Sequence, residues 1–334
     1  MEAPLLDGKE MKDILPKVNY LRLSVTDRCN LRCFYCTYWQ DWEKLAASEI
    51  LRYEELLRLA GVAAQVGIRK IRVTGGEPLV RRGVVDFIKN LHEVPGIEEV
   101  CLTTNGVFLN DLAPALHDAG LRHLNVSLDT RRRDRYQRIT GRDHLPEVLA
   151  GLSRAAALGF TPLKINCVVL QGLNDDELVE LALLARDYPF QVRFIELMPT
   201  ISRSRWKRHF FPLEEVRRRL AGLGPLEEVK VGSTAGPARI FRLPGFTGEL
   251  GFISPISEHR CDRCNRLRLT AAGRLRPCLL NNREVEVKGP LRRGLSDAAL
   301  FYLFHQAICL KGEGGVGAFP GPASCCHSMA SIGG

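Results

Sequence analysis

Short apolar segments with strand character alternate with amphipathic helical segments from residue 20 to about residue 200. The strand candidates span residues 21–25, 70–74, 100–104, 124–127, 163–169 and 192–197. The helix candidates span residues 53–66, 84–93, 112–119, 147–158 and 175–186, the last with Asn174 as its N-cap. A β-then-α alternation of this kind predicts a parallel sheet covered by helices, and therefore an α/β fold.

Polar or glycine-rich motifs follow nearly every predicted strand. These motifs are Thr26-Asp27-Arg28-Cys29, Gly75-Gly76-Glu77-Pro78, Thr104-Asn105-Gly106, Ser127-Leu128-Asp129 and Met198-Pro199. The carboxyl ends of parallel strands form the ligand-binding face of such folds. No G-x-G-x-x-G motif follows the first strand, which argues against an open doubly wound sheet. The pattern favours a partial (β/α)6 barrel of the TIM type with one ligand face.

The regular alternation ends after about residue 200. A last amphipathic helix is expected at residues 213–220, and Gly- and Pro-rich sequence follows as far as Pro237. We place a domain boundary near residue 230, which divides the chain into a barrel (residues 1–230) and a C-terminal segment (residues 231–334). The end of the chain, from residue 311, is rich in Gly, Ala and Ser, and we expect it to be extended.

Charge and cysteine content narrow the possible functions. The net charge of +9 would attract a nucleotide, a nucleic acid or an acidic protein. No apolar run approaches the ~18–20 residues that span a bilayer, and the first residues resemble neither a signal nor a transit peptide, so we expect a cytoplasmic protein without membrane contact. Eleven cysteines in such a protein favour metal or redox chemistry over a disulfide scaffold. Cys101 and Cys167 lie in apolar runs and are expected to be buried.

Cys29, Cys33 and Cys36 form a C-x3-C-x2-C group directly after the first predicted strand. Three thiolates so close together can hold three irons of a [4Fe–4S] cube and leave the fourth iron open. An open coordination position is what a catalytic metal site needs. A zinc site with a distant fourth ligand, or three unrelated cysteines, are the alternatives.

Cys261, Cys264 and Cys278 form a second group with the spacing C-x2-C-x13-C. With His259 as a fourth ligand, these cysteines could form a structural zinc site. A second iron–sulfur cluster is the other interpretation. Taken alone, the spacing gives the two about equal weight.

Several motifs resemble the radical S-adenosylmethionine superfamily. The first cysteine group is its signature, and Gly75-Gly76-Glu77-Pro78, which begins 39 residues beyond Cys36, resembles its second signature. Residues 251–269, around the second cysteine group, closely resemble one family of this superfamily, the GTP 3′,8-cyclases. Further segments similar to that family are residues 18–29, 138–142, 193–199 and 329–334. The resemblance covers residues 15–310 and the last residues of the chain.

The resemblance implies two [4Fe–4S] clusters and S-adenosylmethionine as cofactors. The first cluster would be held by Cys29, Cys33 and Cys36. The second would be held by Cys261, Cys264 and Cys278, with an open iron that takes the guanine of GTP. The implied contacts to S-adenosylmethionine are Tyr35 at the adenine, Gly76 at the amino end, Ser127 and Met198.

The resemblance also implies a set of GTP contacts. These are Arg22, Arg72, Thr103, Lys164, Arg266, Leu267 and Arg268, with Lys70 and Arg193 as plausible additions. Arginine forks bind phosphate oxygens through two hydrogen bonds, so this set suits a triphosphate. Arg266 and Arg268, with the three cysteines of the first group, are the implied catalytic residues. Gly333-Gly334 would reach into the active site.

The implied activity is the conversion of GTP to 3′,8-cyclo-7,8-dihydro-GTP, the first step of molybdenum cofactor biosynthesis. The expected partners are GTP, an electron donor such as a flavodoxin or ferredoxin, and the next enzyme of the pathway, cyclic pyranopterin monophosphate synthase. A homodimer is also expected. The alternatives are a two-cluster radical enzyme that modifies a peptide or another small molecule, and a zinc-stabilised nucleic-acid-binding protein.

Two basic runs and part of the tail fall outside these assignments. Residues 131–135 and 203–208 could suggest nucleic-acid binding, but we expect both to be solvated loop faces. Residues 311–327 depart from the family pattern, which leaves the path of this stretch open. The adjacent Cys325 and Cys326 lie within it and could be reactive thiols.

Overall fold

The computed structural model describes residues 18–36, 44–232, 236–258, 264–279, 282–312 and 329. In these ranges the strands form one twelve-stranded sheet with the order β12-β11-β10-β1-β2-β3-β4-β5-β6-β9-β8-β7. Its centre consists of β1 (Tyr20–Ser24), β2 (Lys70–Thr74), β3 (Glu99–Thr104), β4 (His123–Ser127), β5 (Leu163–Val169) and β6 (Phe190–Glu196). These six strands pair in parallel and in chain order, which confirms the partial (β/α)6 barrel.

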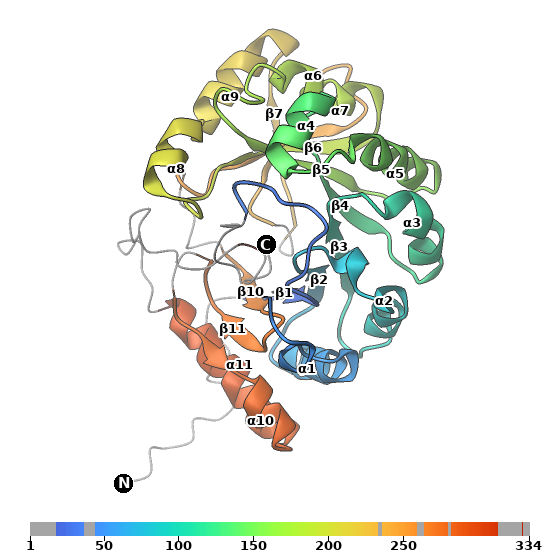
Figure 1. Cartoon of the computed structure of the whole chain (residues 1–334), viewed down its shortest axis with the longest axis vertical. Helices are drawn as coiled ribbons and strands as arrows, with labels where there is room; N and C mark the ends of the chain where they lie inside the picture. Colours follow the sequence, from blue (N-terminus) through green and yellow to red (C-terminus); the bar gives the residue numbers. More distant parts are fainter. Residues whose placement is uncertain are drawn as a thin grey trace.

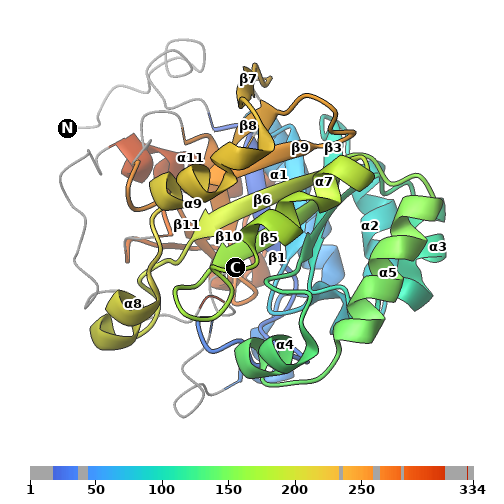
Figure 2. The same cartoon turned by 90° about the horizontal axis from the view of Figure 1, so that it is seen from above.

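Helices cover the outer face of the curved sheet (Figures 1 and 2). They are α1 (Tyr53–Gln65), α2 (Val84–His92), α3 (Leu109–Asp118), α5 (Leu145–Ala157), α6 (Leu178–Ala182), α7 (Leu184–Asp187) and α9 (Leu213–Leu220). Two further helices, α4 (Arg133–Thr140) and α8 (Arg203–His209), pack in a second apolar cluster with the segments that follow β5 and β6. Apolar side chains of the strands and helices form one large core between the two layers. The core thus leaves the inner face of the sheet available for polar groups.

The C-terminal part of the chain extends the sheet at both edges. On one side β9 (Glu249–Ile253) pairs in parallel with β6, and β8 (Arg239–Arg242) and β7 (Glu227–Val229) follow it antiparallel. On the other side β10 (Arg266–Leu269) pairs in parallel with β1, followed by β11 (Arg274–Arg276) and β12 (Val285–Glu286). The segment between β9 and β10 therefore crosses from one edge of the barrel to the other.

Two C-terminal helices, α10 (Lys288–Arg292) and α11 (Asp297–Gly312), complete the described fold. The helix α11 packs against α1 and also contacts β11 and β12 (Figure 1). Its end lies inside the stretch that we expected to be extended from residue 311. That expectation is wrong for Lys311, which lies in the last turn of the helix.

The helix expected at residues 175–186 is wrong in its start and in its continuity. The structure has two short helices, α6 and α7, and Asn174 does not cap either of them. The fully buried Asn174 side chain accepts a hydrogen bond from Leu170 N at 2.7 Å and donates to the carbonyls of Asp129 at 2.7 Å and Val168 at 2.9 Å. The Asn174 side chain makes these hydrogen bonds to residues at strand ends instead of capping a helix, because they satisfy buried backbone groups.

The two basic runs are also not loops throughout. Arg133 begins α4, and Arg135 in the same helix pairs with Asp176 and, at 2.7 Å, with Glu177. Residues 203–209 form α8, which exposes its cationic side chains as expected. The helix packs through Trp206, whose ring nitrogen donates to Leu197 O at 2.9 Å.

No helix in the described ranges combines the length and apolar character needed to cross a bilayer. Cys101 and Cys167 are fully buried, as expected. The boundary near residue 230 stays a prediction, since strands from both sides of it share one sheet.

Candidate active site

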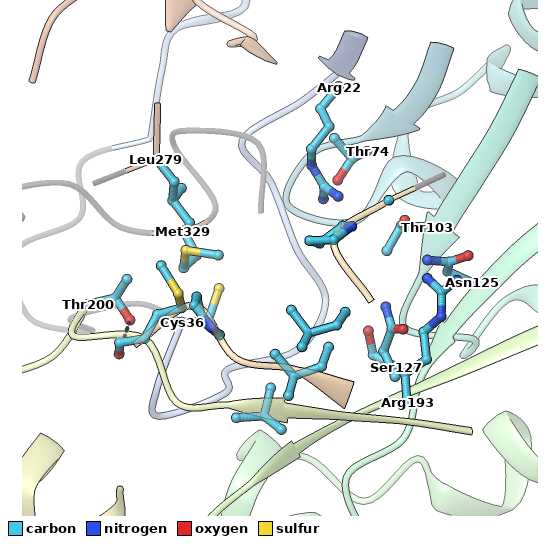
Figure 3. Close-up of a pocket in the computed structure, with 18 of the residues that line it drawn as sticks. Arg22, Cys36, Thr74, Thr103, Asn125, Ser127, Arg193, Thr200, Leu279 and Met329 are labelled. Atoms are coloured by element: carbon cyan, nitrogen blue, oxygen red, sulfur yellow. Dashed lines mark hydrogen bonds between the residues drawn. The ribbon is translucent and has the colours of Figure 1, made fainter. Parts of the chain in front are cut away.

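A cavity of about 420 Å³ lies inside the barrel and extends from the loops at the carboxyl ends of the strands to Tyr20 and Lys70, the first residues of β1 and β2. Its size is within the range of ligand pockets. The predicted site residues that line it are Arg22, Cys29, Cys33, Tyr35, Cys36, Arg72, Gly76, Thr103, Ser127, Met198, Cys264, Arg266, Arg268 and Cys278. Figure 3 shows Cys36, Thr200 and Met329 on one side of this cavity and Arg22, Thr103, Ser127 and Arg193 on the other.

The loop of the first cysteine group is held from outside by the end of α4. Arg32 N donates to Thr140 O at 2.7 Å, and Phe34 N donates to Ile139 O at 3.1 Å. Burial and then the Glu77 carboxylate raise the pKa of the Cys29 thiol to about 11, and burial raises the pKa of Cys33 as well. Thiolates at these positions therefore need a compensating cation, which bound iron would supply.

The loop after β2 packs tightly against the loop after β1. Gly76 N donates to Thr26 O at 2.7 Å, and Glu77 N donates to Arg28 O at 2.8 Å. A Cβ atom at Gly76 would collide with the backbone of Arg28, so only glycine fits here. The backbone at this point can thus come close to a ligand in the cavity.

Glu77 fixes the loop from inside. Its buried carboxylate accepts hydrogen bonds from Thr104 Oγ1 at 2.8 Å, Asn105 N at 2.6 Å and Leu79 N at 3.0 Å. Burial raises the pKa of Glu77 to about 7 in spite of these donors. Asn105 continues the network, since its Nδ2 lies 2.8 Å from Asn30 Oδ1 and 3.8 Å from Cys29 Sγ.

Tyr35 points its hydroxyl group toward the end of β4. The hydroxyl donates to Asp129 Oδ2 at 2.6 Å, and Asp129 Oδ1 accepts from Val168 N at 2.8 Å. Burial raises the pKa of Asp129 to about 6. Thr200 holds the same loop, because its hydroxyl donates to Tyr35 O at 2.8 Å (Figure 3).

Cationic side chains crowd the inner face of the sheet. In the strand register Arg22 of β1 lies between Arg72 of β2 and Arg268 of β10. Burial, and then repulsion by its cationic neighbours, lowers the pKa of Arg22 to about 10. Burial and repulsion by Arg193, Arg72 and Lys70 lower the pKa of Lys164 to about 7. Such a group of buried cations is favourable only with anions among them, and a bound polyanion fits this requirement.

Two asparagine side chains in the cavity wall have hydrogen-bonding capacity that the described residues do not use. Among the described side chains, the buried oxygens Oδ1 of Asn125 and Asn166 lack a hydrogen-bond partner. Both residues line the cavity. Unpaired buried oxygens are costly, so these two amides fit a ligand that carries hydroxyl or amino groups.

Two cysteines of the second group line the same cavity. Cys264 stands at the start of β10 and Cys278 just after β11, and both line the cavity. Burial alone would raise the pKa of the Cys264 thiol, but Arg266 and Lys311 lower it to about 6. Cys261 and His259 lie outside the described residues. The described ranges contain no set of three His, Cys, Asp or Glu side chains that converge on a single metal ion.

Comparisons with known proteins place this geometry in a family. The family model "Radical SAM superfamily" matches residues 23–185, and "Molybdenum Cofactor Synthesis C" matches residues 190–315. The GTP 3′,8-cyclase of Moorella thermoacetica is 49% identical over 295 residues, which are 88% of this chain and 91% of that protein. The GTP 3′,8-cyclase of Pelotomaculum thermopropionicum is 47% identical, again over 88% of this chain and 91% of the relative. The chain belongs to the GTP 3′,8-cyclase family.

A solved structure shows the same fold at low sequence identity. Streptococcus suis SuiB, in a crystal structure bound to S-adenosylmethionine, superposes with a TM-score of 0.62 at 13% identity. The match covers 83% of this chain and 65% of SuiB. Membership of the radical S-adenosylmethionine superfamily implies S-adenosylmethionine and a [4Fe–4S] cluster as cofactors. The chain's relatives do not support the alternatives of a peptide-modifying enzyme or a nucleic-acid binder.

Two residues that the cyclase resemblance implied do not line the cavity in the described structure. Leu267 is fully buried, with its side chain on the opposite face of β10 from Arg266 and Arg268. Lys164 alternates in β5 with Asn166 and Val168, which do line the cavity, so it shares their face of the strand. Gly333, Gly334, Cys325 and Cys326 lie outside the described residues.

The structure adds residues that the cyclase motifs alone do not reveal. Asn125 and Asn166 follow the period-two pattern of inward-facing strand positions, and this pattern was the available signal. Asp129 belongs to the polar motif that follows β4. Glu196 at the end of β6 gave no signal of its own. Its fully buried carboxylate accepts from Ile256 N at 3.1 Å and Ser257 N at 3.0 Å, which fastens the segment that leads to the second cysteine group.

Proposed function

We propose that the chain binds S-adenosylmethionine and GTP together in this one cavity. The overall reaction converts GTP to 3′,8-cyclo-7,8-dihydro-GTP, the first step of molybdenum cofactor biosynthesis. When bound, a [4Fe–4S] cluster supplies the electron that cleaves S-adenosylmethionine and so starts the radical chemistry. The role of the chain is to hold both molecules in register and to keep water away.

The first cluster and S-adenosylmethionine are assigned to the side of the cavity formed by the loops after β1 and β2. The cluster ligands are Cys29, Cys33 and Cys36. The proposed contacts of S-adenosylmethionine are Tyr35, Gly76, Ser127 and Met198. Three observations support this assignment: all seven residues line the same cavity, Gly76 leaves no room for a side chain, and Asn166 Oδ1 has no hydrogen-bond partner among the described residues.

We assign the triphosphate of GTP to the cationic side chains on the inner face of the sheet, which we call the cationic wall. The proposed contacts are Arg22, Arg72, Thr103, Lys164, Arg266 and Arg268, with Lys70 and Arg193 as further cations. Burial and then repulsion among these cations lower the pKa values of Arg22 and Lys164, and each added phosphate charge relieves the repulsion. Leu267 supports this wall from behind, since it places Arg266 and Arg268 on the inner face of β10.

A second [4Fe–4S] cluster, held by Cys261, Cys264 and Cys278, is assigned to the opposite side and would bind the guanine. Two of its three cysteines line the cavity beside Arg266 and Arg268, which supports a role in substrate binding. The zinc alternative predicts a different metal at the same cysteines. Iron, sulfide and zinc analysis of a variant with Cys29, Cys33 and Cys36 replaced by Ala separates the two.

The proposal also includes the expected partners, the oligomeric state and the division of the chain. The reaction needs an electron donor, for which an acidic flavodoxin or ferredoxin suits the net charge of +9. The product would pass to cyclic pyranopterin monophosphate synthase. We further propose that the protein is a cytoplasmic homodimer and that its two parts divide near residue 230. In this proposal Gly333-Gly334 also reach into the pocket. Met329 supports the last point, since it lines the cavity and its N donates to Cys36 O at 2.9 Å.

The observation that carries the proposal is that one cavity is lined by the first cysteine group, by Cys264 and Cys278 of the second, and by cations of the sheet's inner face. Its test is GTP binding by the anaerobically reconstituted Arg266→Ala variant. Loss of charge-assisted hydrogen bonds to phosphate should raise the Kd for GTP about 10- to 100-fold. The control is Arg154→Ala on the exposed face of α5, which should bind GTP like the wild type. An unchanged Kd in Arg266→Ala would contradict the assignment of the wall.

A further inference from the structure

The last turn of α11 returns to the second cysteine group. The helix runs from Asp297 to Gly312 along α1 and the strands β11 and β12. Its Lys311 is half-buried and reaches the start of β10 and the end of β11, which carry Cys264 and Cys278. None of the motifs in the sequence pointed to this residue.

The ammonium group of Lys311 has three acceptors at hydrogen-bond distance. Nζ lies 3.2 Å from Cys264 Sγ, 3.0 Å from Arg266 O and 3.0 Å from Pro277 O. A lysine ammonium has three N–H donors, so this environment uses all of them. The two carbonyls belong to the two segments that carry the cysteines, and Lys311 therefore bridges them.

A solvent-facing lysine at a helix end would be a simpler arrangement, but the contacts argue against it. Within the described ranges, Lys311 forms no ion pair with a carboxylate. Partial burial of an ammonium costs free energy unless hydrogen bonds or negative charge compensate it. Two carbonyls compensate part of that cost, and a thiolate at Cys264 would compensate the rest.

We infer that Lys311 is a positioning residue for the second iron–sulfur cluster, which it serves by joining the two cysteine-bearing segments and by donating an N–H to the Cys264 thiolate. The inference rests on the proposed second cluster. Hydrogen bonds to cluster sulfurs are among the factors that set the reduction potential. Reduction adds one negative charge, so a cation and donor at Cys264 stabilises the reduced form and raises the potential of this cluster.

The test uses the full chain with Cys29, Cys33 and Cys36 replaced by Ala, so that only the second cluster contributes. Lys311→Met and Lys311→Gln are introduced into it and reconstituted anaerobically. The control is Lys89→Met, because Lys89 is an exposed lysine in the last turn of α2. Iron and sulfide are counted, circular dichroism checks the fold, and a redox titration followed by electron paramagnetic resonance gives the midpoint potential.

The expected result is a more negative midpoint potential in Lys311→Met, by about 59 mV or more. This value corresponds to a tenfold lower ratio of reduced to oxidised cluster for a one-electron couple. Lys311→Gln keeps a donor but loses the charge, so it should retain its iron and shift less. Lys89→Met should match the parent. A purely structural lysine would change the iron content without moving the potential.

The outcomes separate this inference from the proposal beneath it. A parent variant that holds zinc, or no iron, would refute the second cluster, and the role of Lys311 would fall with it. A parent with about four irons and an unshifted potential in both Lys311 variants would overturn the inference alone. If Lys311→Met does not fold, Lys311→Gln decides, because it can still donate to the two carbonyls.

Discussion

Gly76 shows how one residue without a side chain can define a binding surface. The loops after β1 and β2 approach each other so closely that a methyl group at Gly76 would displace the Arg28 backbone. The hydrogen bond from Gly76 N to Thr26 O fixes the contact at 2.7 Å. In the proposed site this places peptide backbone, instead of a mobile side chain, beside S-adenosylmethionine.

Gly76→Ala should abolish cleavage of S-adenosylmethionine and destabilise the fold by about 1–3 kcal/mol, the usual range for overpacking. The matched control is Gly61→Ala in α1, where nothing lies within 4 Å of the added Cβ atom. Because alanine is the better helix former, this control should stabilise the protein by about 0.5–1 kcal/mol. Anaerobic 5′-deoxyadenosine assays and urea denaturation measure both effects. Cleavage by Gly76→Ala at the wild-type rate would contradict the proposed contact.

Lys164 gives the site a pH dependence. Its pKa of about 7 in the free protein results from burial and the neighbouring cations. A triphosphate favours the ammonium form, so binding above pH 7 requires proton uptake. The affinity for GTP should therefore fall as the pH rises from about 7.5 to about 8.5, by up to tenfold per unit for one coupled proton.

Isothermal titration in buffers of different ionisation enthalpy measures this proton uptake directly. Lys164→Arg provides the control, because a guanidinium stays charged in this range and should make the affinity nearly independent of pH. If the wild type and Lys164→Arg show the same pH profile, another group controls binding.

At the scale of elements, Glu196 links the barrel to the C-terminal segment. Besides Ile256 N and Ser257 N, its carboxylate accepts hydrogen bonds from Ser257 Oγ and from Leu213 N at 3.2 Å. One buried side chain thereby fixes the start of α9 and the segment before the second cysteine group. The described part of the crossover is thereby attached to the barrel before the chain reaches Cys264.

Glu196→Ala should destabilise the protein by about 3 kcal/mol, because it leaves several buried donors unsatisfied. It should also lower the iron content of the second cysteine group. The control Glu228→Ala on β7 removes a surface ion pair with Arg239 of β8 and should cost less than about 1 kcal/mol. Urea denaturation of both variants tests the difference. Equal free energies of unfolding would show that Glu196 is not an anchor.

The elements differ in how far the sequence predicts them. The strands β2 and β5 match their expected bounds, because each is an apolar or alternating run between clear turns. The helix expected at 175–186 was wrong because Asn174 bonds to strand ends that only the folded chain brings near. The helix α8 was not predicted because it packs through the contact of Trp206 with Leu197, which cannot be recognised in a run of basic residues.

The sequence points to a candidate site residue where a motif carries it, but it does not show contacts that packing creates between distant segments. The described cysteines, Gly76 and the cationic strand residues follow from local spacing or from family resemblance. Asp129 and Lys311 act through contacts to Tyr35 and to Cys264 that join distant parts of the chain. The pairing of β9 with β6 and of β10 with β1 is equally non-local, which is why the extended sheet was not predicted.

At the scale of the whole molecule, the barrel and the C-terminal segment form one sheet, and this allows them to line one cavity. The strands β10 and β1 bring Arg268 and Arg22 side by side, although 246 positions separate them. The C-terminal segment therefore contributes part of the cavity wall as well as the second cysteine group. We expect chemistry on S-adenosylmethionine to depend on whether GTP occupies the same cavity.

The most direct test is anaerobic turnover of the reconstituted protein with reductant and S-adenosylmethionine, in the presence and absence of GTP. We predict GTP-dependent 5′-deoxyadenosine together with a cyclised nucleotide in the mass spectrum. ATP in place of GTP should give neither above background. Equal amounts of 5′-deoxyadenosine with and without GTP, and no new nucleotide, would contradict the account, because the protein would then cleave S-adenosylmethionine without acting on GTP.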